Sequence, residues 1–191
     1  RQMCIRDSGH PYLTGVHRPM TGEVTLEDLA VTGTIPPELN GRYLRNGPNP
    51  ATRPDPASYH WFTGAGMVHC IAIVGGKATW YRNRWVRGVE ACTALGEPLP
   101  PGDRRTDGFD APNTNVIGIA GRTWAIVEAG GHPVEMSRTL ETIAHNKFDG
   151  TLRNSYTAHP HECPVTGERH AICYKGDVMD TVWHTVLDPA G

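Results

Sequence analysis

Short runs of apolar and β-branched residues, separated by glycine-containing turns, recur along the chain. Met67 to Ile73 (MVHCIAI) is followed by Gly75-Gly76 and then by Lys77 to Val86, where Thr, Trp, Tyr and Val alternate with polar residues. Two β-prone runs on either side of a Gly-Gly turn are typical of a β-hairpin. The same pattern pairs Asn115 to Ile119 with Arg122 to Ala129, and Arg169 to Tyr174 with Thr181 to Leu187.

Helical periodicity is weak by comparison. The best helical candidates are Leu26 to Ala30 and a single turn after Pro36-Pro37, where proline is tolerated in a first turn. The proline-rich segment from Cys92 to Asn113 is expected to be an irregular, exposed loop. Successive hairpins at short spacing therefore predict an antiparallel all-β fold: a sandwich, a barrel or a propeller. Periodicity does not choose among these, and the sequence contains no exact repeat.

The two ends of the chain carry little fold information. Residues 1–8 (RQMCIRDS) follow no assignable pattern and are interpreted as a non-native leader, which leaves 9–191 as the folded part. At the other end, the turn signal Asp188 to Gly191 (DPAG) directly follows the last predicted strand. Both ends predict a fragment of a longer domain, truncated at its C-terminus.

Composition narrows the function classes. The chain has 18 Lys+Arg against 20 Asp+Glu, a net charge of −2, which argues against a nucleic-acid partner because such partners need clustered positive charge. No apolar run approaches the length that spans a bilayer, and no signal-peptide pattern is visible. The five cysteines are odd in number and irregularly spaced, which argues against a disulfide framework and favours a reducing, cytoplasmic location.

Histidine is the most informative residue type, because neutral imidazole binds iron, zinc and copper. Four of the ten histidines lie close together: His159, His161, His170 and His184. On a strand, His159, His161 and Cys163 would share one face and could hold zinc locally. However, Pro160 and Pro164 interrupt such a strand, and the spacing matches no standard zinc signature. A non-catalytic, β-rich binding module with this zinc site is the alternative function, and histidines without any metal also remain open.

A set of ordered motifs extends from His10 to Gly191. The most specific is Gly33 to Pro50 (GTIPPELNGRYLRNGPNP). The others are Pro11 to Gly15 (PYLTG), His60 to His69 (HWFTGAGMVH), Trp80 to Val86 (WYRNRWV), Asn113 to Gly118 (NTNVIG), Val127 to Gly130 (VEAG), Phe148 to Leu152 (FDGTL) and Thr157 to Pro160 (TAHP). Together they resemble the carotenoid cleavage dioxygenase family, which includes the stilbene-cleaving enzymes and the retinoid isomerase of the eye.

The resemblance implies a seven-bladed β-propeller, of which only the N-terminal blades are present, with one Fe²⁺ held by four histidines from different blades. The first family ligand lies in the TAHP motif and corresponds to His159. The resemblance places the other three beyond Gly191, and His161, His170 and His184 do not correspond to any of them. The resemblance also implies that Glu128 accepts a hydrogen bond from an iron-binding histidine and fixes its tautomer. Its expected partner is one of the histidines beyond Gly191 rather than His159.

We interpret four residues of the HWFTGAGMVH motif as structural: His60, His69, Gly64 and Gly66. Both histidines are expected to support the fold, and both glycines to serve tight turns. No serine stands in a nucleophile-elbow context and no phosphate-binding loop is present.

The family reading implies an enzyme that cleaves a carbon–carbon double bond of a carotenoid, apocarotenoid or stilbenoid with O₂ to give carbonyl products. The expected partners are an apolar small molecule and O₂, and peripheral membrane contact during substrate uptake stays open. With three of four ligands absent, the fragment itself is expected to be inactive. An isomerase or hydrolase resembling the retinoid branch is a weaker reading within the same family.

Overall fold

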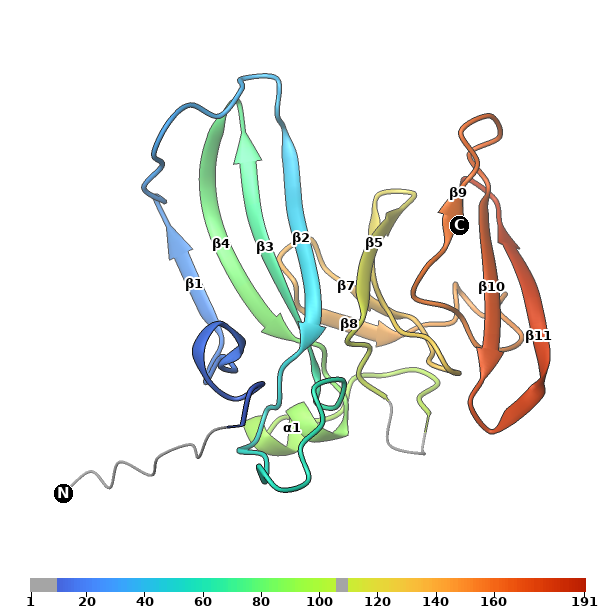
Figure 1. Ribbon diagram of the computed structural model, residues 1–191. Helices are drawn as coiled ribbons and strands as arrows, with labels where there is room; N and C mark the ends of the chain where they lie inside the picture. The colour runs from blue at the N-terminus through green and yellow to red at the C-terminus, as the bar shows by residue number, and fades with distance from the viewer. Residues whose placement is uncertain (1–9, 106–109) are drawn as a thin grey trace.

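The computed structural model describes residues 10–105 and 110–191, which form three antiparallel sheets that follow one another along the chain (Figure 1). The expected leader, residues 1–8, lies outside the described residues. The first sheet has the order β1-β4-β3-β2 and consists of β1 (Val24–Glu27), β2 (Gly41–Pro48), β3 (Gly66–Val74) and β4 (Lys77–Trp85). The second, in the order β5-β6-β7-β8, consists of β5 (Asn115–Ile119), β6 (Arg122–Ile126), β7 (Val134–Met136) and β8 (Thr142–His145). The third, in the order β11-β10-β9, consists of β9 (His161–Glu162), β10 (Arg169–Lys175) and β11 (Val178–Leu187).

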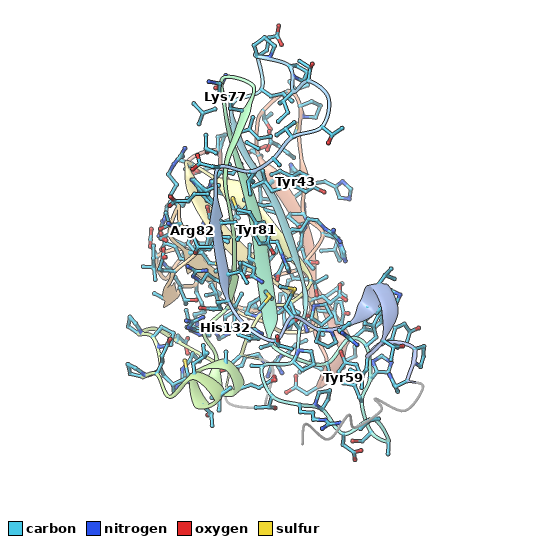
Figure 2. All side chains as sticks on the ribbon, turned by 90° about the vertical axis from the view of Figure 1, so that its left-hand side faces the viewer. Tyr43, Tyr59, Lys77, Tyr81, Arg82 and His132 are labelled. Carbon is cyan, nitrogen blue, oxygen red and sulfur yellow. The ribbon has the colours of Figure 1, made fainter. Side chains whose placement is uncertain are left out.

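All three predicted hairpins are confirmed. Strands β3 and β4 pair from Met67–Trp85 to Val74–Lys77, and the turn between them places Gly75 and Gly76 at positive φ, as a tight glycine hairpin requires. Figure 2 shows Lys77 at the tip of this hairpin. The pairs β5–β6 and β10–β11 follow the predicted order, although β6 ends at Ile126, three residues earlier than expected.

The helical predictions need correction. The segment predicted as a helix from Leu26 to Ala30 instead begins inside strand β1, which pairs with β4. The reason is that the β-branched residues Val24 and Thr25 pair with strand β4, which is distant in sequence, and such tertiary pairing overrides a weak local helical propensity. The turn after Pro36-Pro37 is present, with the amide of Leu39 donating to the Pro36 carbonyl.

A helix was missed between the first two sheets. α1 (Val89–Leu95) occupies the start of the segment expected to be an irregular, exposed loop, and a short 3₁₀ helix, η1 (Gly15–His17), also went unpredicted. The expectation of exposure holds for 93–99 and 101–103, whereas Cys92 at the start of the segment and Asp110 and Asn113 at its end are buried. The Asp110 carboxylate accepts a hydrogen bond from the Val89 amide (2.9 Å) and so satisfies one of the free N–H groups at the start of α1.

Apolar side chains hold the sheets face to face. One buried cluster joins the first sheet to the second, with Val68 and Cys70 on β3 facing Val134 and Met136 on β7. Another joins the second sheet to the third, and a small cluster packs α1 beneath the first sheet. Consecutive residues of β6 serve both interfaces, because Ala125 belongs to the first cluster and Trp124 to the second. The second sheet is therefore covered on both faces.

The edge strands β2, β5 and β9 lie toward the middle of the molecule, where the three sheets approach one another (Figure 1). We call this the inner edge. Here a Cβ atom on Gly66 would lie 1.9 Å from the Pro112 carbonyl oxygen, so this glycine permits the close approach of two backbones. Its predicted role in a tight turn is wrong, since its φ is not positive, whereas Gly64 does adopt a positive φ of 117°.

Candidate functional site

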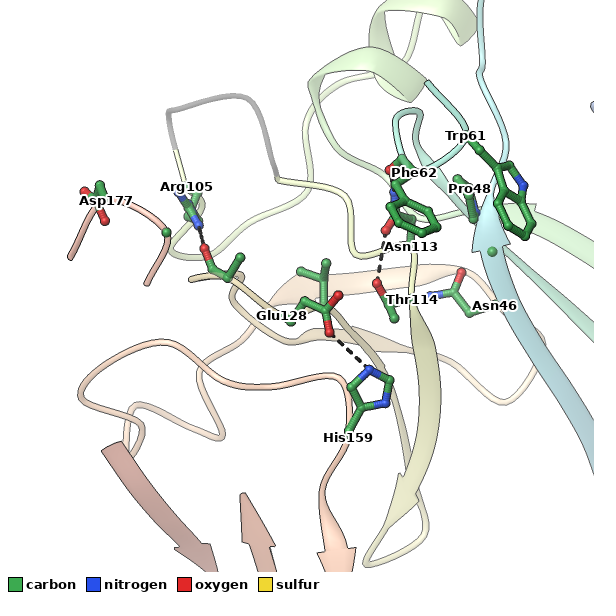
Figure 3. A pocket seen from close by; sticks show the side chains of 14 residues that line it. Asn46, Pro48, Trp61, Phe62, Arg105, Asn113, Thr114, Glu128, His159 and Asp177 are labelled. Carbon is green, nitrogen blue, oxygen red and sulfur yellow. Dashed lines mark hydrogen bonds and ion pairs between the residues drawn. The ribbon is translucent and has the colours of Figure 1, made fainter. Parts of the chain in front are cut away.

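A cavity of about 620 Å³ opens at the inner edge between segments from all three sheets (Figure 3). Trp61, Phe62 and Pro48 form an apolar wall on the side of the first sheet. Glu128 and His159 lie on the opposite side, from the second and third sheets (Figure 3). A cavity of this size, with apolar walls and a few polar groups, is typical of a small-molecule site.

His159 lies in the connection that leads into β9, and the four residues before it, Ser155 to Ala158, are all buried. The Ser155 hydroxyl donates to the carbonyl of Tyr174 (2.9 Å), and the Tyr156 amide donates to the carbonyl of Gly131 (3.2 Å). The chain is thus fixed up to Ala158. The His159 side chain then projects into the cavity with 67% of its surface exposed.

Glu128 reaches the same cavity from the end of β6. The strand ends at Ile126, and Ala129 adopts a positive φ of 60°, so the chain turns and directs Glu128 into the opening. Its Oε2 lies 3.1 Å from Nε2 of His159. The expected partner of Glu128 lies beyond Gly191, so that expectation stays a prediction; among the described residues Glu128 contacts His159, because both side chains project from neighbouring segments into one cavity.

The donor chemistry of His159 fits iron(II) as a single ligand, because imidazole suits iron and this ring is accessible from the cavity. Metal-binding histidines commonly donate their second ring N–H to a carboxylate, and the contact with Glu128 has that form. When Nε2–H donates to Glu128, Nδ1 carries the free lone pair. Within residues 10–105 and 110–191, no three His, Cys, Asp or Glu side chains are grouped so that they could hold a metal ion.

The alternative zinc site is not supported by the described residues. His159 faces the cavity, whereas His161 lies on β9 opposite His170 of β10. Cys163 follows in a turn in which its amide donates to the carbonyl of Glu168. The sequence places these side chains two residues apart, but the regular strand covers only His161–Glu162, so they do not share a face as an uninterrupted strand would require.

The remaining histidines of this group, His170 and His184, meet on the third sheet. Nδ1 of His170 lies 3.1 Å from Nε2 of His184, away from the cavity lining. His60 and His69 also lie outside that lining, and Nδ1 of His60 accepts a hydrogen bond from the Phe62 amide (3.2 Å). The ring of His69 is 2.8 Å from the Tyr81 hydroxyl, and burial, together with the positive charge of Arg45, lowers the pKa of His69. Figure 2 shows Tyr81 on the first sheet.

The prediction from sequence missed the aromatic wall and the buried amides. Trp61 and Phe62 stand inside the quoted HWFTGAGMVH motif but received no role. Asn113, beside the cavity, donates to the carbonyls of Phe62 and Gly64 (3.0 Å each) and so fixes that wall against the second sheet. The sequence did carry one signal for these residues: they lie inside the quoted motifs, for which only a structural role had been considered.

Neither helix in the described part of the chain has the length or apolar character that crossing a bilayer requires.

The family model described as retinal pigment epithelial membrane protein matches residues 17–191. A carotenoid cleavage oxygenase of Mycobacterium tuberculosis is 54% identical over 187 residues, covering 97% of this chain and 37% of that protein. Lignostilbene-alpha,beta-dioxygenase isozyme III of Sphingomonas paucimobilis is 31% identical over 194 residues, covering 94% of this chain and 39% of that protein.

Among solved structures, a lignostilbene dioxygenase of Pseudomonas brassicacearum superposes with a TM-score of 0.79 at 28% identity, covering 95% of this chain and 40% of that chain. The predicted fold class is thereby confirmed: the three sheets are part of a carotenoid-oxygenase propeller. The chain spans less than half the length of these relatives. Because the family model matches residues 17–191 and these relatives share its sequence, the chain belongs to the retinal pigment epithelial membrane protein family, together with a carotenoid cleavage oxygenase and a lignostilbene dioxygenase.

Proposed function

We propose that this chain is the N-terminal part of a non-haem iron(II) dioxygenase that cleaves a carbon–carbon double bond in a carotenoid, apocarotenoid or stilbenoid to give two carbonyl products. The observation that carries the proposal is the meeting of His159 and Glu128 in the wall of an apolar cavity. The names of the relatives support the same reaction class.

Iron(II), when bound, would supply the site with the capacity to bind and activate O₂. The residues of this chain contribute binding and orientation. His159 provides one neutral nitrogen ligand, and Glu128 fixes its ring through the 3.1 Å contact. The remaining ligands would come from a longer protein, because we propose that residues 9–191 are part of a larger domain.

The apolar wall binds the substrate. Trp61 and Phe62 present aromatic faces to the cavity, and their rings are stacked on one another with centroids 5.7 Å apart. A conjugated alkene is flat and apolar, so burial against these rings both stabilises it and excludes water from its double bond. The cavity accommodates a stilbene-sized molecule or one segment of a longer polyene.

The test is bound iron in the longer protein that contains this chain, measured for the wild type, for His159→Ala and for His161→Ala. His161 is the matched control, because it is an exposed histidine two residues away on β9 and lies outside the cavity lining. We expect stoichiometric iron in the wild type and in His161→Ala, and its loss in His159→Ala. Iron that survives in His159→Ala, or zinc in its place, would contradict the proposal.

A second measurement concerns the 191-residue chain itself. With one proposed ligand, it should hold no tight iron and cleave neither a stilbene nor an apocarotenoid. Product formation by the purified chain would overturn the proposal that the catalytic unit needs the further ligands.

A further inference from the structure

Asn115 connects the second sheet to the segment that carries His159. It is the first residue of β5, at the inner edge, and its side-chain Nδ2 donates to the carbonyl of Ala158 (2.8 Å). Its Oδ1 accepts a hydrogen bond from the backbone amide of Val116 (2.7 Å), which fixes the orientation of the Asn115 side chain. The bond to Ala158 spans 43 residues of sequence, so it is a tertiary contact and not a local turn.

The accepting carbonyl belongs to the peptide bond that joins Ala158 to His159. Ala158 is completely buried, so an unpaired carbonyl at this position would be costly. A hydrogen bond to this oxygen fixes the plane of the peptide from which the His159 backbone departs. The direction of the imidazole into the cavity is therefore set, in part, from the second sheet.

The first sheet contributes to the same support. Asn46 on β2 donates from its side-chain Nδ2 to the backbone carbonyls of Pro112 and Asn115 (3.0 Å each). The amides of Asn46 and Asn115 thus form a relay along the inner edge, from β2 to β5 and then to the peptide before His159. Asn115 itself does not line the cavity, so it acts on the site through His159 and not on a bound molecule.

We propose that Asn115 is a positioning residue for His159: its side-chain amide holds the Ala158–His159 peptide so that the imidazole is presented for metal binding. This inference rests on the proposed function, since it assigns Asn115 a role toward the iron ligand. The substitution Asn115→Asp tests it, because aspartate keeps the shape and the acceptor for Val116 but cannot donate to the Ala158 carbonyl.

The matched control is Asn49→Asp. Asn49 is buried where Asn115 is partly buried, and its Nδ2 donates to the backbone carbonyls of Met20 (3.0 Å) and Pro50 (3.4 Å), far from His159 in the chain and outside the cavity lining. Each variant of the longer protein loses its side-chain donor to backbone carbonyls, so Asn49→Asp should lower the melting temperature at least as much as Asn115→Asp. Only Asn115→Asp should weaken iron(II) affinity, by about 10- to 100-fold in a chelator competition, the range found when a group that orients a metal ligand is removed.

The longer amide in Asn115→Gln retains the donor and should recover part of the lost affinity. Should Asn115→Asp fail to fold, Asn115→Ala removes the donor without placing a carboxylate against a carbonyl, and the same loss of affinity is expected. Equal iron affinity in the wild type and these variants overturns the inference while leaving the proposed function intact. A wild type without iron overturns both.

Discussion

The two interfaces between neighbouring sheets are built from different kinds of side chain. Between the first and second sheets the buried residues are mainly aliphatic or sulfur-containing, such as Val68, Val134 and Met136. Between the second and third sheets three of the nine buried residues are aromatic and pack in a row: Trp124 packs on Phe148 with ring centroids 4.7 Å apart, and Phe148 on Tyr156 at 4.9 Å. We call these the aliphatic interface and the aromatic interface.

The difference extends to the backbone. At the aliphatic interface, Gly66 lets the first sheet approach Pro112, and the side-chain amides of Asn46 and Asn113 hydrogen-bond across the gap. At the aromatic interface, large rings fill the space, and the contact nearest the site is the amide bond from Asn115 to Ala158. One interface therefore depends on close approach and the other on side-chain volume, which predicts different sensitivities to mutation.

The largest effect is expected for Trp124→Ala at the aromatic interface. Removing a fully buried indole should lower the free energy of unfolding by about 3–5 kcal/mol, from lost burial and the cavity that remains. Chemical denaturation of Trp124→Ala and of Met136→Ala measures both interfaces with one method. A greater loss for Met136→Ala would contradict the greater dependence of the aromatic interface on volume.

Gly66→Ala tests close approach at the aliphatic interface. The added methyl group would meet the Pro112 carbonyl oxygen, which is backbone and cannot rotate away, so overpacking should cost about 1–3 kcal/mol. Gly47→Ala is the matched control, because Gly47 is also a strand residue at the inner edge and a Cβ there would meet no atom within 4 Å. Denaturation midpoints that move equally for both variants would show that close approach is not the cause.

His145 gives the aliphatic side of the molecule a pH dependence. It is buried, and its Nε2 lies 2.8 Å from the Arg87 carbonyl, which joins β8 to the chain leaving the first sheet. Burial lowers the pKa of His145, and the hydrogen bond to the Arg87 carbonyl opposes this shift only in part. Below the ordinary histidine pKa of about 6.5, the unfolded chain therefore binds a proton that the folded chain resists.

The expected result is a loss of stability as the pH falls from about 6.5 toward the lowered pKa of the folded state. Unfolding free energies of the wild type and His145→Gln, measured between pH 8 and pH 5, isolate this contribution, because every other titrating group is common to both. His145→Gln should show the shallower dependence. Parallel curves would exclude His145 as the source.

The smallest effect is expected for Tyr156→Phe, within the aromatic interface. The Tyr156 hydroxyl is buried without a hydrogen-bond partner among the described side chains and backbone, and burial raises its pKa. Replacing it with hydrogen removes a polar atom whose desolvation is uncompensated, while the ring stays in place. The free energy of unfolding should stay the same or increase by less than about 1 kcal/mol. Any decrease in the free energy of unfolding would reveal a partner for the hydroxyl.

The hairpins could be predicted from sequence because their information is local: a glycine-containing turn and the β-prone runs beside it suffice. Strand β1 could not be predicted in this way, because its partner β4 lies more than fifty residues away in the chain. α1 was missed because its start is preceded by Gly88 instead of a strong capping residue, and the capping carboxylate comes from distant Asp110.

The candidate site shows the same division. His159 and Glu128 were chosen through motifs, yet their contact depends on the turn at Ala129 and on where the third sheet packs. Asn115 was quoted only as part of a motif, because the sequence does not reveal which carbonyl its amide will meet. Local patterns thus predicted elements and candidates, whereas partners required the packed structure.

The double burial of β6 has a consequence for protein engineering. Trp124 and Ala125 are adjacent in sequence but face opposite interfaces, so a backbone shift that accommodates a new side chain at one position displaces the other. Substitutions at the two positions should then be strongly non-additive, unlike substitutions on the open faces of the first and third sheets. A library for altering this protein should randomise Trp124 and Ala125 as one unit, or leave the strand unchanged and place its diversity in the cavity wall.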